Sequence, residues 1–435
     1  MDISVIGCGY LGAVHAACLA GMGHDVVGVD VDAAKVASLN DGNAPFFEPG
    51  MPEMLAKGLG AGHLRFTTEI SAAAHCDVHF LAVGTPQRKN EKAADMRFVD
   101  SAVESLIPHL RPGAIVVGKS TVPVGTAARL TERIHQDSPE TAVIWNPEFL
   151  REGFAVADTM APDRLVYGLQ PGTEDSALVL DEIYAAALSA GTPRIMTDFA
   201  TAELVKVAAN AFLATKISFI NAMADVCEVS GADVVQLADA LGYDTRIGRR
   251  FLNAGLGFGG GCLPKDIRAF MARAGELGAD QALTFLREID SINMQRRSRI
   301  IELAREVCGG SLLGRRIAVL GLAFKPNSDD VRDSPALSVA AQLQLQGASV
   351  VATDPKAVAN SALRFPELVY SDSVVDAARD ADVLMLLTEW PEYVDLDPFE
   401  LAGIVAAPVM VDGRNALDPG KWRGAGWTYR ALGRP

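Results

Sequence analysis

The sequence has little of several features that define well-known protein classes. Its six cysteines are scattered, without the close pairs or metal-ligand spacings that indicate disulfides or a metal site. No apolar run approaches the roughly 20 residues that a membrane-spanning helix requires. The chain starts Met1-Asp2-Ile3, without a basic leader. We therefore expect a reduced, cytoplasmic setting, no metal and no membrane partner.

A surplus of basic charge is also absent. The chain has 54 acidic and 39 basic residues and a formal charge of −15, which argues against nucleic acid and anionic membranes as partners. Hydrophobic residues make up 49% and charged residues 21%, as in globular proteins. A length of 435 residues predicts two or three domains.

The first part of the chain alternates between strand-like and helix-like segments. An apolar strand at residues 3–6 is followed by a glycine-rich turn, a helix at 13–20 and a second strand at 26–29. Further apolar strands are expected at residues 78–83, 115–118 and 143–145. Such alternation predicts a parallel sheet covered by helices on both faces.

The middle of the chain is helical, and the strand–helix alternation returns after Gly314. Residues 202–230 predict one helix of roughly 28 residues, and further helices are expected at 234–241, 267–277 and 283–307. The fold class is therefore α/β, with two Rossmann-like parallel-sheet domains joined by a central helical region with a long helix. We place the domains at residues 1–198, 199–308 and 309–435.

The glycine-rich turn has the spacing of a dinucleotide-binding motif. Gly7, Gly9 and Gly12 lie between a predicted strand and a predicted helix, where they allow a tight turn and close approach of a diphosphate. Asp30 ends the next strand and can accept hydrogen bonds from ribose hydroxyls, which favours NAD over NADP. Lys35 follows about one helical turn later.

Polar side chains follow several of the predicted strands. Thr85-Pro86 and the segment containing Thr121 stand where strand ends meet a ligand in open parallel sheets. Glu148 and Glu152 are four residues apart, so in a helical turn both carboxylates would share a face and suit proton handling. Polar or acidic turns without a catalytic role explain these residues equally well.

Glu203, Lys206 and Asn210 have helical spacing in the long predicted helix. Their positions at i, i+3 and i+7 place them on one face. A lysine and an asparagine on such a face can orient a hydroxyl and stabilise a developing oxyanion. The alternative is a salt bridge on an exposed stripe.

Cys262 stands between a glycine-rich stretch and a Lys-Asp pair. The segment is Gly255-Leu-Gly-Phe-Gly-Gly-Gly-Cys262-Leu-Pro-Lys265-Asp266. Glycines let a backbone fold tightly around a ligand, and a nearby cation favours the reactive thiolate. We interpret the glycines as room for a substrate carbon. A flexible loop that holds a small structural cysteine is the alternative.

The second α/β part has no three-glycine turn. A segment with the cations Lys325 and Arg332 replaces it, and Arg246 and Arg414 add two more cations in glycine-containing loops. Such groups suit an anionic ligand other than a second dinucleotide.

Seven of these segments, in order, resemble the UDP-glucose 6-dehydrogenase family within the UDP-glucose/GDP-mannose dehydrogenase group. The resemblance covers nearly the whole chain. Its motifs are Gly-Cys-Gly-Tyr-Leu-Gly, Val-Gly-Thr-Pro, Lys-Ser-Thr-Val-Pro-Val-Gly-Thr, Asn-Pro-Glu-Phe-Leu-Arg-Glu-Gly, Gly-Phe-Gly-Gly-Gly-Cys-Leu-Pro-Lys-Asp, Gly-Leu-Ala-Phe-Lys-Pro-Asn and Asp-Gly-Arg-Asn. Leu11 and Gly261 depart from the residues that are frequent in the family.

The resemblance implies a four-electron oxidation of a sugar C6 alcohol to a carboxylate, with NAD as the cofactor. Cys262 would form a thiohemiacetal and then a thioester, so that the aldehyde stays bound between the two oxidations. Lys206 and Asn210 would stabilise oxygen charge. Proton handling would fall to Asp266, Thr121, Glu148 and Glu152.

The resemblance also implies the residues that contact each ligand. NAD would contact Gly7, Gly9, Tyr10, Leu11, Gly12, Asp30, Lys35, Thr85, Thr121, Glu152, Lys265 and Arg332. UDP-glucose would contact Phe149, Leu150, Arg151, Lys206, Asn210, Arg246, Phe251, Leu252, Asn253, Phe258, Gly259, Lys325 and Arg414. Arg246 would reach the site of a second subunit in a homodimer formed through the central helix.

Three alternatives remain at this point. The substrate can be another nucleotide sugar, such as GDP-mannose, a UDP-N-acetylhexosamine or a TDP-hexose. A two-electron hydroxyacid dehydrogenase also pairs a Rossmann domain with Lys and Asn on a helix, but it has no use for a nucleophilic cysteine. The third alternative is a non-catalytic NAD-sensing module.

Overall fold

A sheet of eight strands is the centre of the first part of the chain. The strand order is β3-β2-β1-β4-β5-β6-β7-β8, and neighbouring strands are parallel except β6 and β7. The direction of the order reverses between β1 and β4, which is the usual ligand position in such sheets. The strands are β1 (Asp2–Ile6), β2 (Asp25–Val29), β3 (Leu64–Thr67), β4 (Val78–Leu81), β5 (Ile115–Gly118), β6 (Ala142–Trp145), β7 (Leu165–Leu169) and β8 (Arg194–Asp198).

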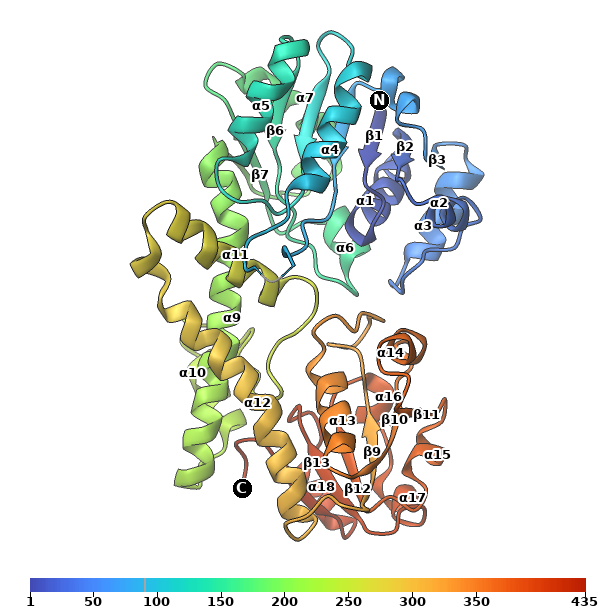
Figure 1. Ribbon diagram of the computed structural model, residues 1–435, viewed down its shortest axis with the longest axis vertical. Coiled ribbons are helices and arrows are strands. Elements are labelled where there is room, and N and C mark those ends of the chain that lie inside the picture. Colours follow the sequence, from blue (N-terminus) through green and yellow to red (C-terminus); the bar gives the residue numbers. More distant parts are fainter. Residues whose placement is uncertain (90) are drawn as a thin grey trace. The chain divides into compact units, whose positions relative to one another are not determined.

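Helices cover both faces of this sheet (Figure 1). Ile3 and Val5 pack in one buried cluster, whereas Ile6 packs in another, because successive side chains of a strand point to opposite faces. The helices are α1 (Tyr10–Gly21), α2 (Ala33–Asn40), α3 (Met51–Gly60), α4 (Arg97–Leu106), α5 (Thr126–Asp137), α6 (Ala155–Met160), α7 (Ala177–Ile183) and α8 (Ala185–Ser189).

A second sheet, with six strands that are all parallel, repeats the same order in the last part of the chain. Its order is β11-β10-β9-β12-β13-β14. The strands are β9 (Arg316–Leu320), β10 (Ser349–Thr353), β11 (Val369–Tyr370), β12 (Val383–Leu386), β13 (Val409–Asp412) and β14 (Thr428–Ala431). The two parallel-sheet regions and the helical middle confirm the predicted fold class.

Several helices of this second region begin at a side chain that caps them. Ser334, Asp397 and Asp418 accept backbone N–H groups, and each precedes a proline in the first helical turn. The helices are α13 (Pro335–Leu345), α14 (Val358–Arg364), α15 (Val374–Ala378), α16 (Pro391–Val394), α17 (Pro398–Ala402) and α18 (Pro419–Gly424).

Four helices lie between the two sheets in the sequence. They are α9 (Phe199–Ser230), α10 (Val234–Gly242), α11 (Leu263–Glu276) and α12 (Phe285–Val307). Elsewhere in the described chain and before α12, short 3-10 helices occur at Ile70–His75, Ile107–His109, Glu174–Ser176 and Asp280–Leu283. The long helix begins three residues before the predicted start because Asp198 caps it through the backbone N–H and hydroxyl of Thr201.

The structure is a computed structural model that describes residues 1–89 and 91–435. It divides into two compact units, the first with Met1–Ala209 and Arg268–Gly278, the second with Asn210–Ile267 and Ala279–Pro435. Helices α9 and α11 therefore contribute residues to both units. The three-domain division with boundaries at 198 and 308 stays a prediction.

Helix α9 is long and apolar enough to cross a membrane by length and composition, contrary to the expectation from the sequence. Its most apolar 18-residue window has a mean hydropathy of 1.3. However, Ser218 and Asn221 are fully buried in the second unit, where they bond to the carbonyl of Ile289 and the N–H of Gly255. These contacts are typical of a core helix.

Candidate active site

Asp30 fixes the glycine-rich turn between β1 and α1. Its carboxylate accepts the backbone N–H of Cys8 at 2.8 Å and pairs with Lys35 Nζ at 2.9 Å. Gly7 has a φ of 90°, and a Cβ on Gly12 would lie 1.8 Å from the carbonyl oxygen of Gly7. The turn therefore requires glycine at both positions, and it leaves the N-terminus of α1 without a side-chain cap.

Tyr10 and Leu11, within this turn, are half-buried and pack against the core of the first unit. The ring of Tyr10 lies 4.6 Å from that of Phe46, and its hydroxyl bonds to Glu48. The family resemblance places Tyr10 near the cofactor, but it gives no sign of Glu48, a lone acidic residue in an apolar loop.

Thr85 joins the ends of β4 and β5. Its hydroxyl donates to the carbonyl oxygen of Thr121 at 2.8 Å. The structure thus brings together two of the predicted cofactor residues at the carboxyl end of adjacent strands.

Glu203 caps α5 instead of standing on an exposed stripe. It is buried, and its two carboxylate oxygens accept the N–H groups of Gly125 and Ala127, each at 2.7 Å. Burial raises the pKa of Glu203, while these N–H groups oppose the rise. The alternative of a solvated salt bridge on this face is therefore wrong.

Glu148 pairs with Lys206 in the first unit. The carboxylate lies 2.9 Å from the ammonium, and it also accepts the backbone N–H of Leu150 at 2.7 Å. Both side chains are largely buried, with exposed fractions of 12% and 7%. The expected helical turn that would align Glu148 with Glu152 is absent from this described segment. Glu148 faces a cation and not a like charge.

Phe149 lies beside two cations. The guanidinium carbon of Arg164 is 3.8 Å from the centre of the ring, and Lys206 Nζ is 5.8 Å from it. Arg164 was not singled out from the sequence, because it stands 15 residues away in a separate loop. It stacks closely enough to fix the orientation of the ring.

A second lysine is buried behind this pair. Lys119 donates to Asn146 at 3.0 Å and to the hydroxyl of Tyr184 at 3.2 Å. Burial lowers its pKa to about 8; the charge of Glu148 raises the value and that of Lys206 lowers it. The pKa of Lys119 therefore depends on the charges of Glu148 and Lys206. The sequence signal for this buried group is a single lysine that directly follows an apolar strand.

Cys262 directly precedes α11 and is exposed, whereas the other five cysteines are buried. Asp266 follows one helical turn later, is 2% exposed and accepts Asn210 Nδ2 at 2.7 Å. Lys265 pairs with the other oxygen of Asp266 at 2.8 Å. The second unit thus brings together Asn210, Lys265 and Asp266, with the thiol one turn away at a helix end that stabilises negative charge.

The glycines before Cys262 serve close packing, so their interpretation as room for a substrate carbon is wrong. A Cβ on Gly259 would meet the carbonyl oxygen of Asp333 at 2.4 Å, and one on Gly260 would meet the ring of Phe324 at 2.8 Å. Added Cβ atoms at Gly255, Gly257 and Gly261 would meet Gly413, Asn293 and Arg332.

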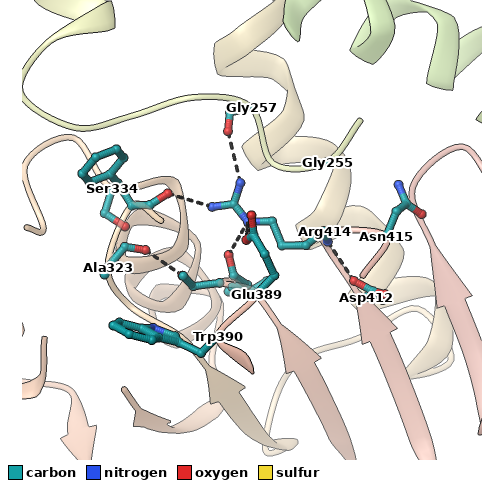
Figure 2. Close-up of polar contacts among 12 residues, drawn as sticks. Gly255, Gly257, Ala323, Ser334, Glu389, Trp390, Asp412, Arg414 and Asn415 are labelled. Carbon is teal, nitrogen blue, oxygen red and sulfur yellow. Dashed lines mark hydrogen bonds and ion pairs between the residues drawn. The ribbon is translucent and has the colours of Figure 1, made fainter. Parts of the chain in front are cut away.

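Arg414 ties the glycine-rich segment to the ends of the second sheet (Figure 2). Its guanidinium donates to the carbonyl oxygens of Gly257 at 3.3 Å and Phe324 at 3.1 Å, and it pairs with Glu389 at 3.2 Å. Its backbone N–H bonds to Asp412 at 2.8 Å. The contact of Arg414 with a nucleotide stays a prediction.

The other predicted cations of the second unit lie beside local partners. Arg332 is exposed and forms a bidentate pair with Asp330. Lys325 lies over the ring of Phe324 at 5.2 Å. Arg246 is exposed and pairs with Asp244.

The remaining predicted sugar contacts differ in exposure. Leu252 and Phe258 are buried, Phe251 has a φ of 67°, and Asn253 accepts a hydrogen bond from Arg249 at 2.7 Å. Arg151, in the first unit, forms a bidentate pair with Asp158. Among the described residues, no group of three or more His, Cys, Asp or Glu side chains could hold a metal ion.

Comparison with known proteins matches three successive regions of the chain to one family. The chain matches the UDP-glucose/GDP-mannose dehydrogenase family over its NAD binding domain (residues 1–188), central domain (200–295) and UDP binding domain (318–419). A UDP-glucose 6-dehydrogenase of Rhizobium meliloti is 40% identical over the full length of both chains.

Two solved structures share the fold over the whole chain. The UDP-glucose dehydrogenase of Pyrobaculum islandicum has a TM-score of 0.90 and 37% identity, and the match covers 100% of this chain and 98% of that one. The UDP-D-ManNAc dehydrogenase of Pyrococcus horikoshii has a TM-score of 0.85 and 25% identity, and covers 100% and 99%. The resemblance seen in the seven motifs is confirmed, and the chain belongs to the UDP-glucose/GDP-mannose dehydrogenase family.

Proposed function

We propose that the protein oxidises the C6 alcohol of UDP-glucose to a carboxylate, with two molecules of NAD⁺ and one of water consumed. The observation that carries this proposal is Cys262, an exposed thiol at the start of α11, one turn from the Asn210–Asp266–Lys265 group. A two-electron dehydrogenase needs no such nucleophile. The NAD binding and UDP binding domains support the choice of cofactor and substrate class.

The residues of the first unit fit NAD⁺, which supplies the hydride acceptor for both oxidations. The turn at Gly7 and Gly12 leaves no space for side chains, and the uncapped start of α1 offers N–H groups to a diphosphate. Asp30 is directed to the turn and to Lys35, and the charge of its carboxylate would repel a 2′-phosphate placed beside it.

Cys262 holds the sugar carbon between the two oxidations. The first oxidation converts the alcohol to an aldehyde and releases one proton. The thiol adds to this aldehyde, and the second oxidation converts the resulting thiohemiacetal to a thioester. Water then cleaves the thioester to give the carboxylate and return the thiol.

Lys206 and Asn210 stabilise oxygen charge at C6. The two residues are one turn apart in α9, so both side chains lie on the same face of that helix. Asp266 holds the amide of Asn210 in one orientation, which is the requirement for preorganised stabilisation. Thr121, Glu148 and Glu152 exchange protons with solvent through water.

The test is the number of NADH molecules formed per UDP-glucose consumed, with identification of the product. We expect two NADH and UDP-glucuronate. One NADH with a free aldehyde or ketone would instead indicate a two-electron dehydrogenase. Cys262→Ser should release no acid, whereas Cys76→Ala, at a buried cysteine, should retain full stoichiometry.

The nucleotide sugar is the second point to test. The two relatives described above whose names specify UDP-glucose share 40% and 37% identity with this chain, against 25% for the UDP-D-ManNAc enzyme. We therefore expect the highest kcat/KM with UDP-glucose in a panel with GDP-mannose, UDP-N-acetylmannosamine and a TDP-hexose. A preference for another member of the panel would refute this choice.

The protein acts as a homodimer through the central helix, in the cytoplasm. Phe212, Phe219 and Val226 recur every seven residues along α9, and their exposed fractions are 66%, 46% and 53%. An apolar stripe at this spacing suits helix–helix contact. Phe219→Glu should convert the dimer to a monomer in light scattering, whereas Leu363→Glu, at an exposed leucine elsewhere, should not.

A further inference from the structure

Glu48 is a buried carboxylate that bonds to two other segments of the first unit. It is 3% exposed. One oxygen accepts the backbone N–H of Gly153 at 2.6 Å and the hydroxyl of Tyr10. The other accepts the N–H of Ala155 at 2.7 Å and that of Val156 at 3.4 Å.

These bonds connect two parts of the proposed site. Tyr10 follows Gly9 and is the first residue of α1, so its ring moves with the glycine-rich turn. Gly153 has a φ of 80° and directly follows Glu152. The hydroxyl of Tyr10 also accepts the N–H of Gly153 at 2.9 Å. Tyr10, Glu48 and Gly153 therefore form a closed triangle of hydrogen bonds.

The charge of Glu48 is stabilised by the start of α6. The N–H groups of Gly153, Ala155 and Val156 converge on the carboxylate from the end of the helix that carries positive partial charge. Burial raises the pKa of the Tyr10 hydroxyl, and the hydrogen bond to Glu48 raises it further, so the phenol remains a donor to the carboxylate. The hydrogen bonds of the triangle to Glu48 are charge-assisted, so they fix the distances and directions between Tyr10, Glu48 and Gly153.

We propose that Glu48 is a positioning residue that couples occupancy of the Gly7–Gly12 turn by NAD to the placement of Glu152. This inference rests on the proposed function, in which NAD binds at the glycine-rich turn and Glu152 takes part in proton exchange. A shift of the turn on binding moves Tyr10, and the carboxylate transmits that shift to the peptide that joins Glu152 to Gly153. Glu48 itself is 3% exposed, so it acts through Tyr10 and Gly153 and not by direct contact with a ligand.

A cap of α6 with no other role is the competing explanation, and a double-mutant cycle separates the two. Tyr10→Phe removes one hydroxyl, and Glu48→Gln removes the charge while keeping the size of the side chain. We expect each change to weaken NADH binding and to lower kcat by roughly three- to tenfold. The double variant should bind NADH about as weakly as the more impaired single variant. The two effects on NADH affinity should therefore be non-additive by about threefold or more.

The KM for UDP-glucose should change less than the affinity for NADH. Asp418→Asn is the matched control, since it weakens a carboxylate cap of α18 that has none of these contacts. This control should lower the Tm without changing NADH affinity or kcat.

Additive effects in the cycle, or a change in Tm alone, would overturn the coupling. If Glu48→Gln does not fold, Glu48→Asp takes its place, because the shorter side chain keeps the charge but cannot span both partners. A wild-type protein that binds no NADH would overturn both this inference and the proposed function. An active wild type with additive variants would overturn this inference alone.

Discussion

The ion pair of Lys206 and Glu148 makes a strong prediction about stability, because both groups are largely buried. At 2.9 Å, the attraction of two unit charges is roughly 6 kcal/mol in an effective dielectric of about 20. Desolvation offsets most of this, so the pair itself contributes little net stability. Removal of one partner leaves the other charge buried, which costs roughly 3–5 kcal/mol.

Lys119 makes the two single changes unequal. In Lys206→Met, Glu148 still has the buried ammonium of Lys119 nearby, so we expect a loss of roughly 2–3 kcal/mol. In Glu148→Gln, two buried cations lose their carboxylate, so we expect roughly 3–5 kcal/mol. The pKa of Lys119 is raised by the charge of Glu148 and lowered by that of Lys206, which supports a larger loss for Glu148→Gln than for Lys206→Met.

Urea unfolding of the three variants checks the prediction, with separate transitions fitted for the two units because a chain of this size need not unfold in one step. The double variant Lys206→Met/Glu148→Gln should lie nearer to the wild type than Glu148→Gln alone, since it buries one fewer unpaired cation. A double variant that loses the sum of the two single effects would refute the pairing. So would a larger loss in Lys206→Met than in Glu148→Gln.

Three further predictions concern other buried groups of the first unit. Burial lowers the pKa of Lys119 from 10.5 to about 8, so the unfolded state binds more protons between these values and stability rises with pH there. Relative to Lys119→Met, the free energy of unfolding should increase by roughly 3 kcal/mol between about pH 7.5 and about pH 10.5, and a flat difference would contradict this. A Cβ on Gly118 would lie 2.1 Å from the ring of Trp145, so Gly118→Ala should cost roughly 1–3 kcal/mol in thermal unfolding. Gly60→Ala, with open space around it, should be neutral or slightly stabilising. Glu203→Ala should lower the Tm by exposing the N–H groups of α5, at a cost of roughly 1–3 kcal/mol; an unchanged Tm would show that the cap is dispensable.

The glycine-rich turn could be predicted from the sequence because its geometry is local. Gly7 and Gly12 lie within six residues of one another, and the bond from Cys8 to Asp30 follows from adjacent parallel strands. The fold class could be predicted for the same reason, because the hydrophobic periods of strands and helices are visible in short windows of sequence.

The partners of buried carboxylates could not be predicted in this way. Helical spacing places Glu203 and Lys206 on one face, but it does not indicate that one meets the start of α5 and the other meets Glu148. Both partners come from segments more than 50 residues away, and their contact depends on the packing of the whole unit. Glu48 was missed for the same reason.

The glycines before Cys262 show a second limit. Composition indicates that a loop can bend and come close to something, but it does not say to what. In the structure the neighbours are Asp333, Phe324 and Arg332 of the same unit. Flexibility in a sequence is therefore not evidence of space for a ligand.

The capped helices have a consequence for how the first unit selects negative charge. Asp32, Glu203 and Glu48 bond to the N–H groups at the starts of α2, α5 and α6. Each of these ends would otherwise attract an anion, and each now repels one. The start of α1 has no side-chain cap and no acidic residue in its first turn; α7 and α8 share this, but only α1 directly follows the glycine-rich turn. Carboxylates of the chain thus remove three competing positive ends, and the start of α1 stays open for a diphosphate beside the glycine turn.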